Sequence, residues 1–163
     1  MTRIVAGQSA PLFSLENLGG GLTSLASTLE RGPVVLAFFK ITCPVCQFTF
    51  PFLERIHLAF KGQATVLAVS QDDARDTADF MSEYKLSFSI LLDEDSYPIS
   101  NEYGLTNVPT LFLLNSRGKV LVSSLGFVRA DLEAIWKTLA DQVPHAPAGL
   151  FYPDEVIPSY KPG

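Results

Sequence analysis

Cysteine and histidine are both scarce in this chain of 163 residues, which contains two of each. Both cysteines, Cys43 and Cys46, lie in one CPVC motif, so no pair is left over for a framework of structural disulfides. A structural zinc site takes four ligands, and only His57 and His145 are available to join the two cysteines. We therefore expect neither a metal nor any other cofactor, and the spacing of the cysteines indicates chemistry at the thiols themselves.

Positive charge is scarce as well. The chain has 12 Lys and Arg against 17 Asp and Glu, which gives a net charge of -5. Because nucleic-acid binding depends on clustered Lys and Arg, we do not expect a nucleic acid as partner. No stretch has the apolar length that a bilayer span needs, and residues 1–7 lack the apolar core of a signal peptide. We expect a cytoplasmic protein as the sequence is given, and a secreted, periplasmic or anchored one if a signal was trimmed.

The composition is that of a packed globular protein, with 47% apolar and 18% charged residues. At this length one domain is expected, and it can bury a stable core without disulfides or bound metal ions. We assign residues 1–142 to that domain and residues 143–163 to a tail that is rich in proline and has no hydrophobic periodicity. The tail is expected either to strap the surface or to be partly disordered.

Apolar patterns predict the secondary structure. Two runs, 34–39 and 64–70, are apolar enough to form strands that are buried on both faces of a sheet. The order of elements predicts an α/β fold with a central mixed sheet, helices on both faces and an N-terminal hairpin extension. The remaining strand predictions are 12–18, 88–92, 110–114 and 119–124, and the helix predictions are 24–29, 46–61, 74–84, 99–103 and 131–141.

The helix predicted after the cysteines has two unusual features. Pro51 lies inside it and is expected to kink it, because proline has no amide hydrogen for the carbonyl one turn earlier. Phe48 and Phe52 fall off its main apolar stripe. We favour packing of these two rings beneath the tail or a loop over an exposed surface that docks partners. The stripe itself consists of Phe50, Leu53, Ile56 and Phe60.

The position of the CPVC motif suggests different roles for the two thiols. Cys43 follows the apolar strand and is expected at a helix N-terminus, where unpaired amides and the helix dipole favour a thiolate, so Cys43 is the predicted nucleophile. Cys46 lies one turn further in, where it could resolve a mixed disulfide by pairing with Cys43. Pro44 suits the first helical turn, and Val45 adds no charge. The alternative is two buried, unreactive thiols that pack as small apolar side chains.

Residues 39–51, a strand, CPVC and a helix with proline five residues after the second cysteine, resemble the thioredoxin superfamily. Val108-Pro109-Thr110 resembles its cis-proline loop, which lies beside the CxxC in space and offers backbone groups to an extended substrate. Sequence alone leaves the Val108–Pro109 bond open, because most such bonds are trans, and the resemblance implies a cis bond. The residues assigned to substrate binding are Pro44, Val45, Val108 and Pro109.

The flanking segments are similar to the redoxin branch of that superfamily, which includes the TlpA/ResA-like oxidoreductases and the AhpC/TSA peroxiredoxins. Two positions depart from the pattern. Ala37 stands where classical thioredoxins carry a buried acid, and Thr49 stands where ResA-like proteins carry a glutamate. Cys46 is therefore left without an acidic helper for proton transfer. The similar segments are 7–15, 69–72, 91–93 and 103–126.

The resemblance implies thiol:disulfide exchange with a protein disulfide or dithiol, and with a further protein that acts as reductant or oxidant. A peroxiredoxin-like peroxidase is the first alternative. Against it, Thr42 directly precedes Cys43 instead of standing three residues before it, and Pro109 lies about where the peroxide-activating arginine would be. A Cu(I)-binding module is the second alternative, since two thiolates suit a soft ion.

Overall fold

The fold is described from a computed structural model, in which residues 2–163 are placed. The strands are β1 (Ser14–Asn17), β2 (Leu22–Ser24), β3 (Val34–Phe39), β4 (Thr65–Ser70), β5 (Ser89–Leu92), β6 (Thr110–Leu114), β7 (Val120–Leu125), β8 (Phe127–Val128) and β9 (Tyr160–Lys161). The helices are α1 (Leu25–Leu29), α2 (Pro44–Ala59), α3 (Ala74–Glu83), α4 (Pro98–Glu102) and α5 (Arg129–Ala140).

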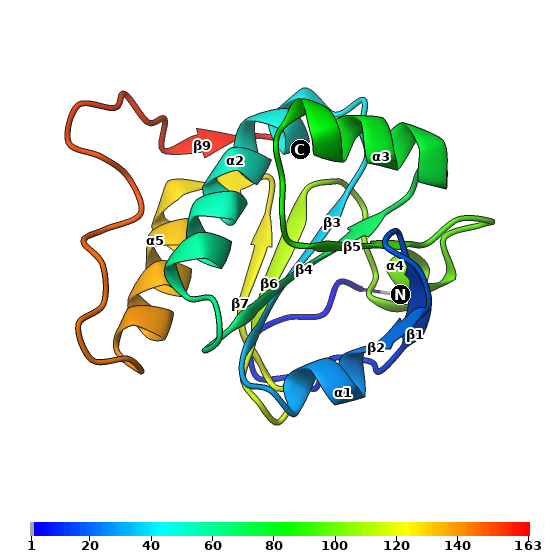
Figure 1. Ribbon diagram of the computed structural model, residues 1–163, viewed down its shortest axis with the longest axis horizontal. Coiled ribbons are helices and arrows are strands. Elements are labelled where there is room, and N and C mark those ends of the chain that lie inside the picture. The colour runs from blue at the N-terminus through cyan, green and yellow to red at the C-terminus, as the bar shows by residue number, and fades with distance from the viewer. Residues whose placement is uncertain (1) are drawn as a thin grey trace.

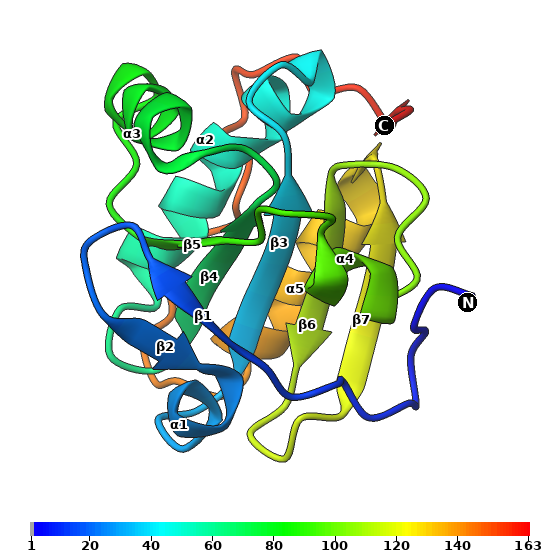
Figure 2. The same ribbon diagram turned by 90° about the vertical axis from the view of Figure 1, so that its right-hand side faces the viewer.

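A seven-stranded mixed sheet forms the centre of the molecule, in the order β2-β1-β5-β4-β3-β6-β7. The β3, β4 and β5 strands are parallel, and the other neighbours pair antiparallel. Figures 1 and 2 show helices on both faces of this sheet. The predicted α/β class, with its central mixed sheet, is therefore confirmed.

The β3 strand is the core of the sheet, and all six of its side chains are buried. Because successive residues of a strand face opposite sides, Val35, Ala37 and Phe39 pack with α2 and α5 on one face. Val34, Leu36 and Phe38 pack on the other face, with α1 and the N-terminal segment that crosses the front of the sheet in Figure 2. This two-sided burial explains why the sequence of β3 is continuously apolar.

The N-terminal hairpin forms as predicted, with β1 antiparallel to β2. Its turn contains Gly20 and Gly21, both with positive φ, a conformation that glycine adopts without steric cost. The α2 helix begins at Pro44, two residues before the predicted start, because the side chain of Cys43 caps it. It continues through Pro51 to Ala59. No helix within residues 2–163 is long and apolar enough to cross a membrane.

Residues 143–163 form a strap that leaves α5 and passes beside α2, as the orange-to-red segment of Figure 1 shows. Its end forms β9, which pairs antiparallel with β8. Phe151 of the strap packs against Phe52, with 5.1 Å between ring centroids, and also touches Phe127. Phe52 is only 7% exposed, so the expectation that it packs beneath the tail is confirmed.

Candidate active site

The two cysteines lie where β3 passes into α2. Cys43 is the N-cap residue of α2, with an extended backbone, and its sulfur accepts a hydrogen bond of 3.2 Å from the amide of Cys46. Pro44 occupies the first helical turn, where its missing amide hydrogen leaves no bond unmade. A sulfur at this position faces the positive end of a sixteen-residue helix.

The two thiols occupy different environments. Cys43 is half-buried, whereas Cys46 is completely buried against the core between α2 and the sheet. Burial raises the pKa of the Cys46 thiol well above its ordinary value, and its hydrogen bond with the Cys43 side chain raises that pKa further. Cys46 therefore keeps its proton at neutral pH, and Cys43 is the thiol that an incoming molecule can reach.

The loop before β6 lies directly beside Cys43. The Val108–Pro109 peptide bond is cis, and the thiol of Cys43 donates to the carbonyl oxygen of Val108 at 3.5 Å. Val108 is half-buried and Pro109 is buried. On the helix side, Pro44 is exposed and Val45 is half-buried. The structure thus brings the two assigned segments together through the contact of Cys43 with Val108, although these two residues are 65 positions apart in the sequence.

Neither position that departs from the thioredoxin pattern supplies a charge. Ala37 is buried in β3, and the buried hydroxyl of Thr49 donates to the carbonyl of Val45 at 2.7 Å. A different carboxylate lies at the site: Asp72 accepts the amide hydrogen of Ile41 at 2.8 Å. The negative charge of Asp72 also raises the pKa of Cys46, as a smaller cause than burial.

In the sequence, Asp72 falls in the segment 69–72 that is similar to the redoxin branch, and the sequence assigns it no role beside the cysteines. The position of Asp72 beside the cysteine loop follows from the parallel pairing of β3 with β4, in which Phe39 lies opposite Ser70. Residues that follow two parallel neighbours emerge at the same edge of the sheet. Asp72 therefore meets the loop that leads into Cys43 and fixes its backbone.

A polar cavity of about 210 Å³ adjoins the loop that carries Val108. Lys40 and Tyr97 form part of its wall, and the Lys40 ammonium lies 5.6 Å from the centre of the Tyr97 ring. Asn107, beside Val108, lines the same cavity. Within residues 2–163, no group of three or more His, Cys, Asp and Glu side chains is arranged to hold a metal ion.

Comparisons with known proteins agree with this geometry. The model of the AhpC/TSA family matches residues 6–123. The thiol-disulfide oxidoreductase ResA of Bacillus subtilis (strain 168) is 32% identical over 120 residues, which are 72% of this chain and 66% of ResA. The match therefore spans slightly less than two thirds of that relative's length.

Two solved structures share the fold. A Chlorobium tepidum crystal structure, assigned as the thiol:disulfide interchange protein DsbE, has a TM-score of 0.73 and 29% identity, and the match covers 82% of this chain and 94% of that one. The thioredoxin domain of a Bacteroides vulgatus thiol-disulfide oxidoreductase has a TM-score of 0.74 and 23% identity, and the match covers 86% of this chain and 99% of that one. The fold is thus thioredoxin-like, as the resemblance implied.

Proposed function

The chain belongs to the AhpC/TSA family, and from that premise we propose that it is a thiol:disulfide oxidoreductase in which Cys43 is the nucleophile and Cys46 the resolving thiol. One observation carries the proposal. A reachable thiol caps a helix N-terminus, next to a loop carbonyl, and a fully buried, protonated thiol stands one turn behind it. Buried unreactive cysteines would not need one of the pair to be reachable.

The exchange proceeds in two steps that conserve atoms and electrons. The Cys43 thiolate attacks one sulfur of a substrate disulfide, the S–S bond breaks, and a mixed disulfide forms as the first substrate thiolate leaves. Cys46 then loses its proton and attacks the Cys43 sulfur, which releases the second substrate thiolate and closes the Cys43–Cys46 disulfide. Two electrons pass to the substrate, whose thiolates take up the protons. Oxidation of a substrate dithiol is the same sequence in reverse.

The substrate is a protein disulfide or dithiol, and a second protein restores the Cys43–Cys46 pair. An extended substrate segment binds along the Val108–Pro109 backbone and contacts Pro44 and Val45 on the helix side. The exposed or half-buried positions of Pro44, Val45 and Val108 around Cys43 support this arrangement. The compartment sets the direction, since a reducing one favours substrate reduction and an oxidising one favours disulfide formation.

The family match also brings peroxidase activity into consideration, because peroxiredoxins belong to the same family. The residues beside Cys43 favour exchange instead. Thr42 is exposed, and it directly precedes Cys43 instead of standing three residues before it. Pro109 occupies the candidate position for a peroxide-activating arginine. Peroxidase activity is therefore the second candidate, and the assay below separates the two.

Reduction of insulin, with dithiothreitol as electron donor, tests the proposal. Wild type should accelerate the reaction, Cys43→Ser should abolish the acceleration, and Cys46→Ser should trap a mixed disulfide that is visible under non-reducing conditions. An inactive wild type, or a fully active Cys43→Ser, would reject the assignment. Thiol-dependent consumption of hydrogen peroxide by the same samples, faster than insulin reduction, would favour the peroxidase.

A further inference from the structure

The end of the strap reaches the candidate active site, although it comes from the opposite end of the sequence. The side-chain amide of Asn107 donates to the carbonyl of Gly163 at 3.4 Å. The backbone of Gly163 approaches the Val108 carbonyl so closely that a Cβ atom there would lie 2.5 Å from that oxygen. The same oxygen accepts the hydrogen bond from the Cys43 thiol.

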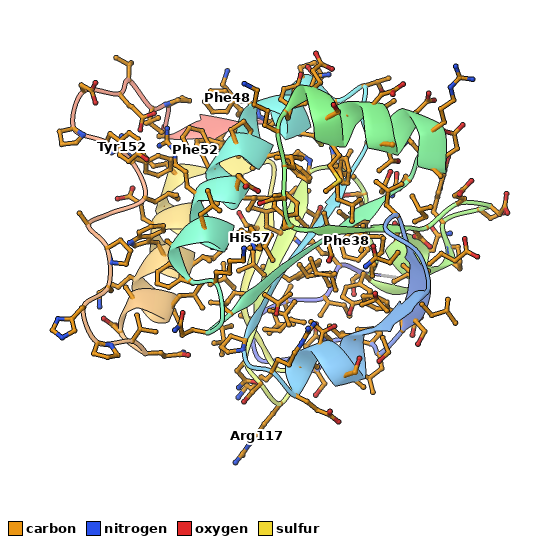
Figure 3. The ribbon with its side chains drawn as sticks, in the orientation of Figure 1. Phe38, Phe48, Phe52, His57, Arg117 and Tyr152 are labelled. Atoms are coloured by element: carbon orange, nitrogen blue, oxygen red, sulfur yellow. The ribbon has the colours of Figure 1, made fainter. Side chains whose placement is uncertain are left out.

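The strap also covers the aromatic side of the first turns of α2. The Lys161 ammonium lies 4.9 Å from the centre of the Phe48 ring, and that ring packs edge-on against Phe127 at 5.0 Å. Phe127 in turn pairs with Lys161 through the β8–β9 ladder. Figure 3 shows Phe48 and Phe52 on the side of α2 that faces the strap. An approaching protein therefore meets the strap there, and not bare aromatic surface.

A polar cluster of Arg55, Tyr152 and Glu155, here called the latch, fixes the middle of the strap to α2. The guanidinium of Arg55 in α2 donates two hydrogen bonds of 2.7 Å to the carboxylate of Glu155, and a third of 3.2 Å to the carbonyl of Leu150. Arg55 also stacks on Tyr152, 4.0 Å from its ring centre. The pairing with Arg55 lowers the pKa of Glu155 to about 2, so the latch stays charged at neutral pH.

We propose that residues 160–163 are a specificity element, which blocks one side of the cysteine pair to bulky protein disulfides. This inference rests on the proposed exchange function. The polar cavity lined by Lys40 and Tyr97 also includes Asn107 and Val108, the two residues that the strap end contacts, so the cavity and the strap end lie against the same loop. A larger substrate must displace the strap end before its backbone reaches Val108.

Alkylation of Cys43 in the reduced protein tests the blockade without depending on catalysis. Two reagents are compared, iodoacetamide as the small probe and a maleimide attached to a long polyethylene glycol as the bulky one. Deletion of residues 160–163 leaves Leu150, Phe151 and the latch in place. It should raise the rate of the bulky reagent about tenfold, which corresponds to about 1.4 kcal/mol, and leave the rate of iodoacetamide unchanged.

Two further variants keep the test decisive if the deletion variant does not fold. Glu155→Gln should raise the bulky rate in the same direction by a smaller factor, because it loosens the latch without shortening the chain. Asp141→Asn, which removes an exposed ion pair with Lys137 at the end of α5 and leaves both the Arg55–Glu155 pair and residues 160–163 intact, is the matched control and should change neither rate. Equal acceleration of both reagents, or of neither, in the strap variants would overturn the proposal.

Insulin reduction links the strap to substrate choice. The deletion should lower KM for insulin with little change in kcat, and should leave the reduction of a small disulfide such as oxidised glutathione unaffected. An unchanged or higher KM would contradict a specificity role. If wild type reduces no disulfide at all, the exchange function fails, and the alkylation result still decides whether the strap blocks the site.

Discussion

The buried thiol of Cys46 predicts a specific loss of stability at alkaline pH. In the folded protein, burial keeps this thiol protonated far above the ordinary pKa of 9.0, whereas in the unfolded chain it ionises near that value. Well below pH 9 both states hold the proton, so the full stability is present. As pH rises further, only the unfolded state loses the proton, and folding becomes less favourable.

The size of the effect follows from one proton. The free energy of unfolding should fall by about 1.4 kcal/mol at pH 10 and about 2.7 kcal/mol at pH 11, relative to neutral pH. Burial raises the pKa of Tyr103 as well, so the total alkaline loss is larger. The Cys46 part is isolated by comparing two variants that share this tyrosine.

Urea unfolding at pH 7, 10 and 11 measures the difference between Cys43→Ala and the double variant Cys43→Ala/Cys46→Ala. The shared Cys43→Ala change prevents disulfide formation, and burial, the main cause of the shift at Cys46, remains. Cys43→Ala should lose stability with rising pH faster than the double variant does. The free energy of unfolding of Cys43→Ala, relative to that of the double variant, should fall by about 1.4 kcal/mol between pH 7 and pH 10 and by about 2.7 kcal/mol between pH 7 and pH 11. If the two curves stay parallel from pH 7 to pH 11, Cys46 is not held protonated and the reasoning is wrong.

Two further predictions concern the supports of the site. Phe52→Ala should lower the free energy of unfolding by about 3–5 kcal/mol, because it empties a space beneath the strap, and Leu58→Ala on the exposed side of α2 should cost far less in the same urea titration. A similar cost for both would show that the strap does not enclose Phe52. Asp93→Ala removes the carboxylate that accepts two amides and a hydroxyl at the start of α4, so stability should fall by about 1–3 kcal/mol and hydrogen exchange there should quicken. The exposed neighbour Glu94 is its control, and equal exchange in both alanine variants would refute that role.

Local patterns in the sequence determined most of the framework. The uninterrupted apolar run of β3 predicts a strand that is buried on both faces, and all six of its side chains are buried. Element ends were less certain. The apolar periodicity of α2 begins only at Cys46, whereas the helix starts at Pro44 with Cys43 as its cap, which agrees with the helix N-terminus expected at Cys43.

The chemistry of the site depended on sequence and tertiary structure in different ways. The two cysteines can be identified as a pair from the sequence alone. They lie three residues apart at a helix start, and the geometry of one helical turn places their side chains close together. The approach of Asp72 to the cysteine loop depends on which strands pair, and strand order is not a local property. Sequence reasoning therefore found no carboxylate for the site, although one lies in the next loop.

The tail is the clearest case in which the tertiary structure decided. Its residues have no periodicity, so the sequence predicts either a strap over the surface or a partly disordered segment. Arg55 and Glu155 are 100 residues apart, and only the folded chain brings the guanidinium and the carboxylate to 2.7 Å. The sequence by itself determined a redox pair at a helix start. The packing of the strap on α2 decided which side of that pair is covered, because contacts between distant segments carry no local signal.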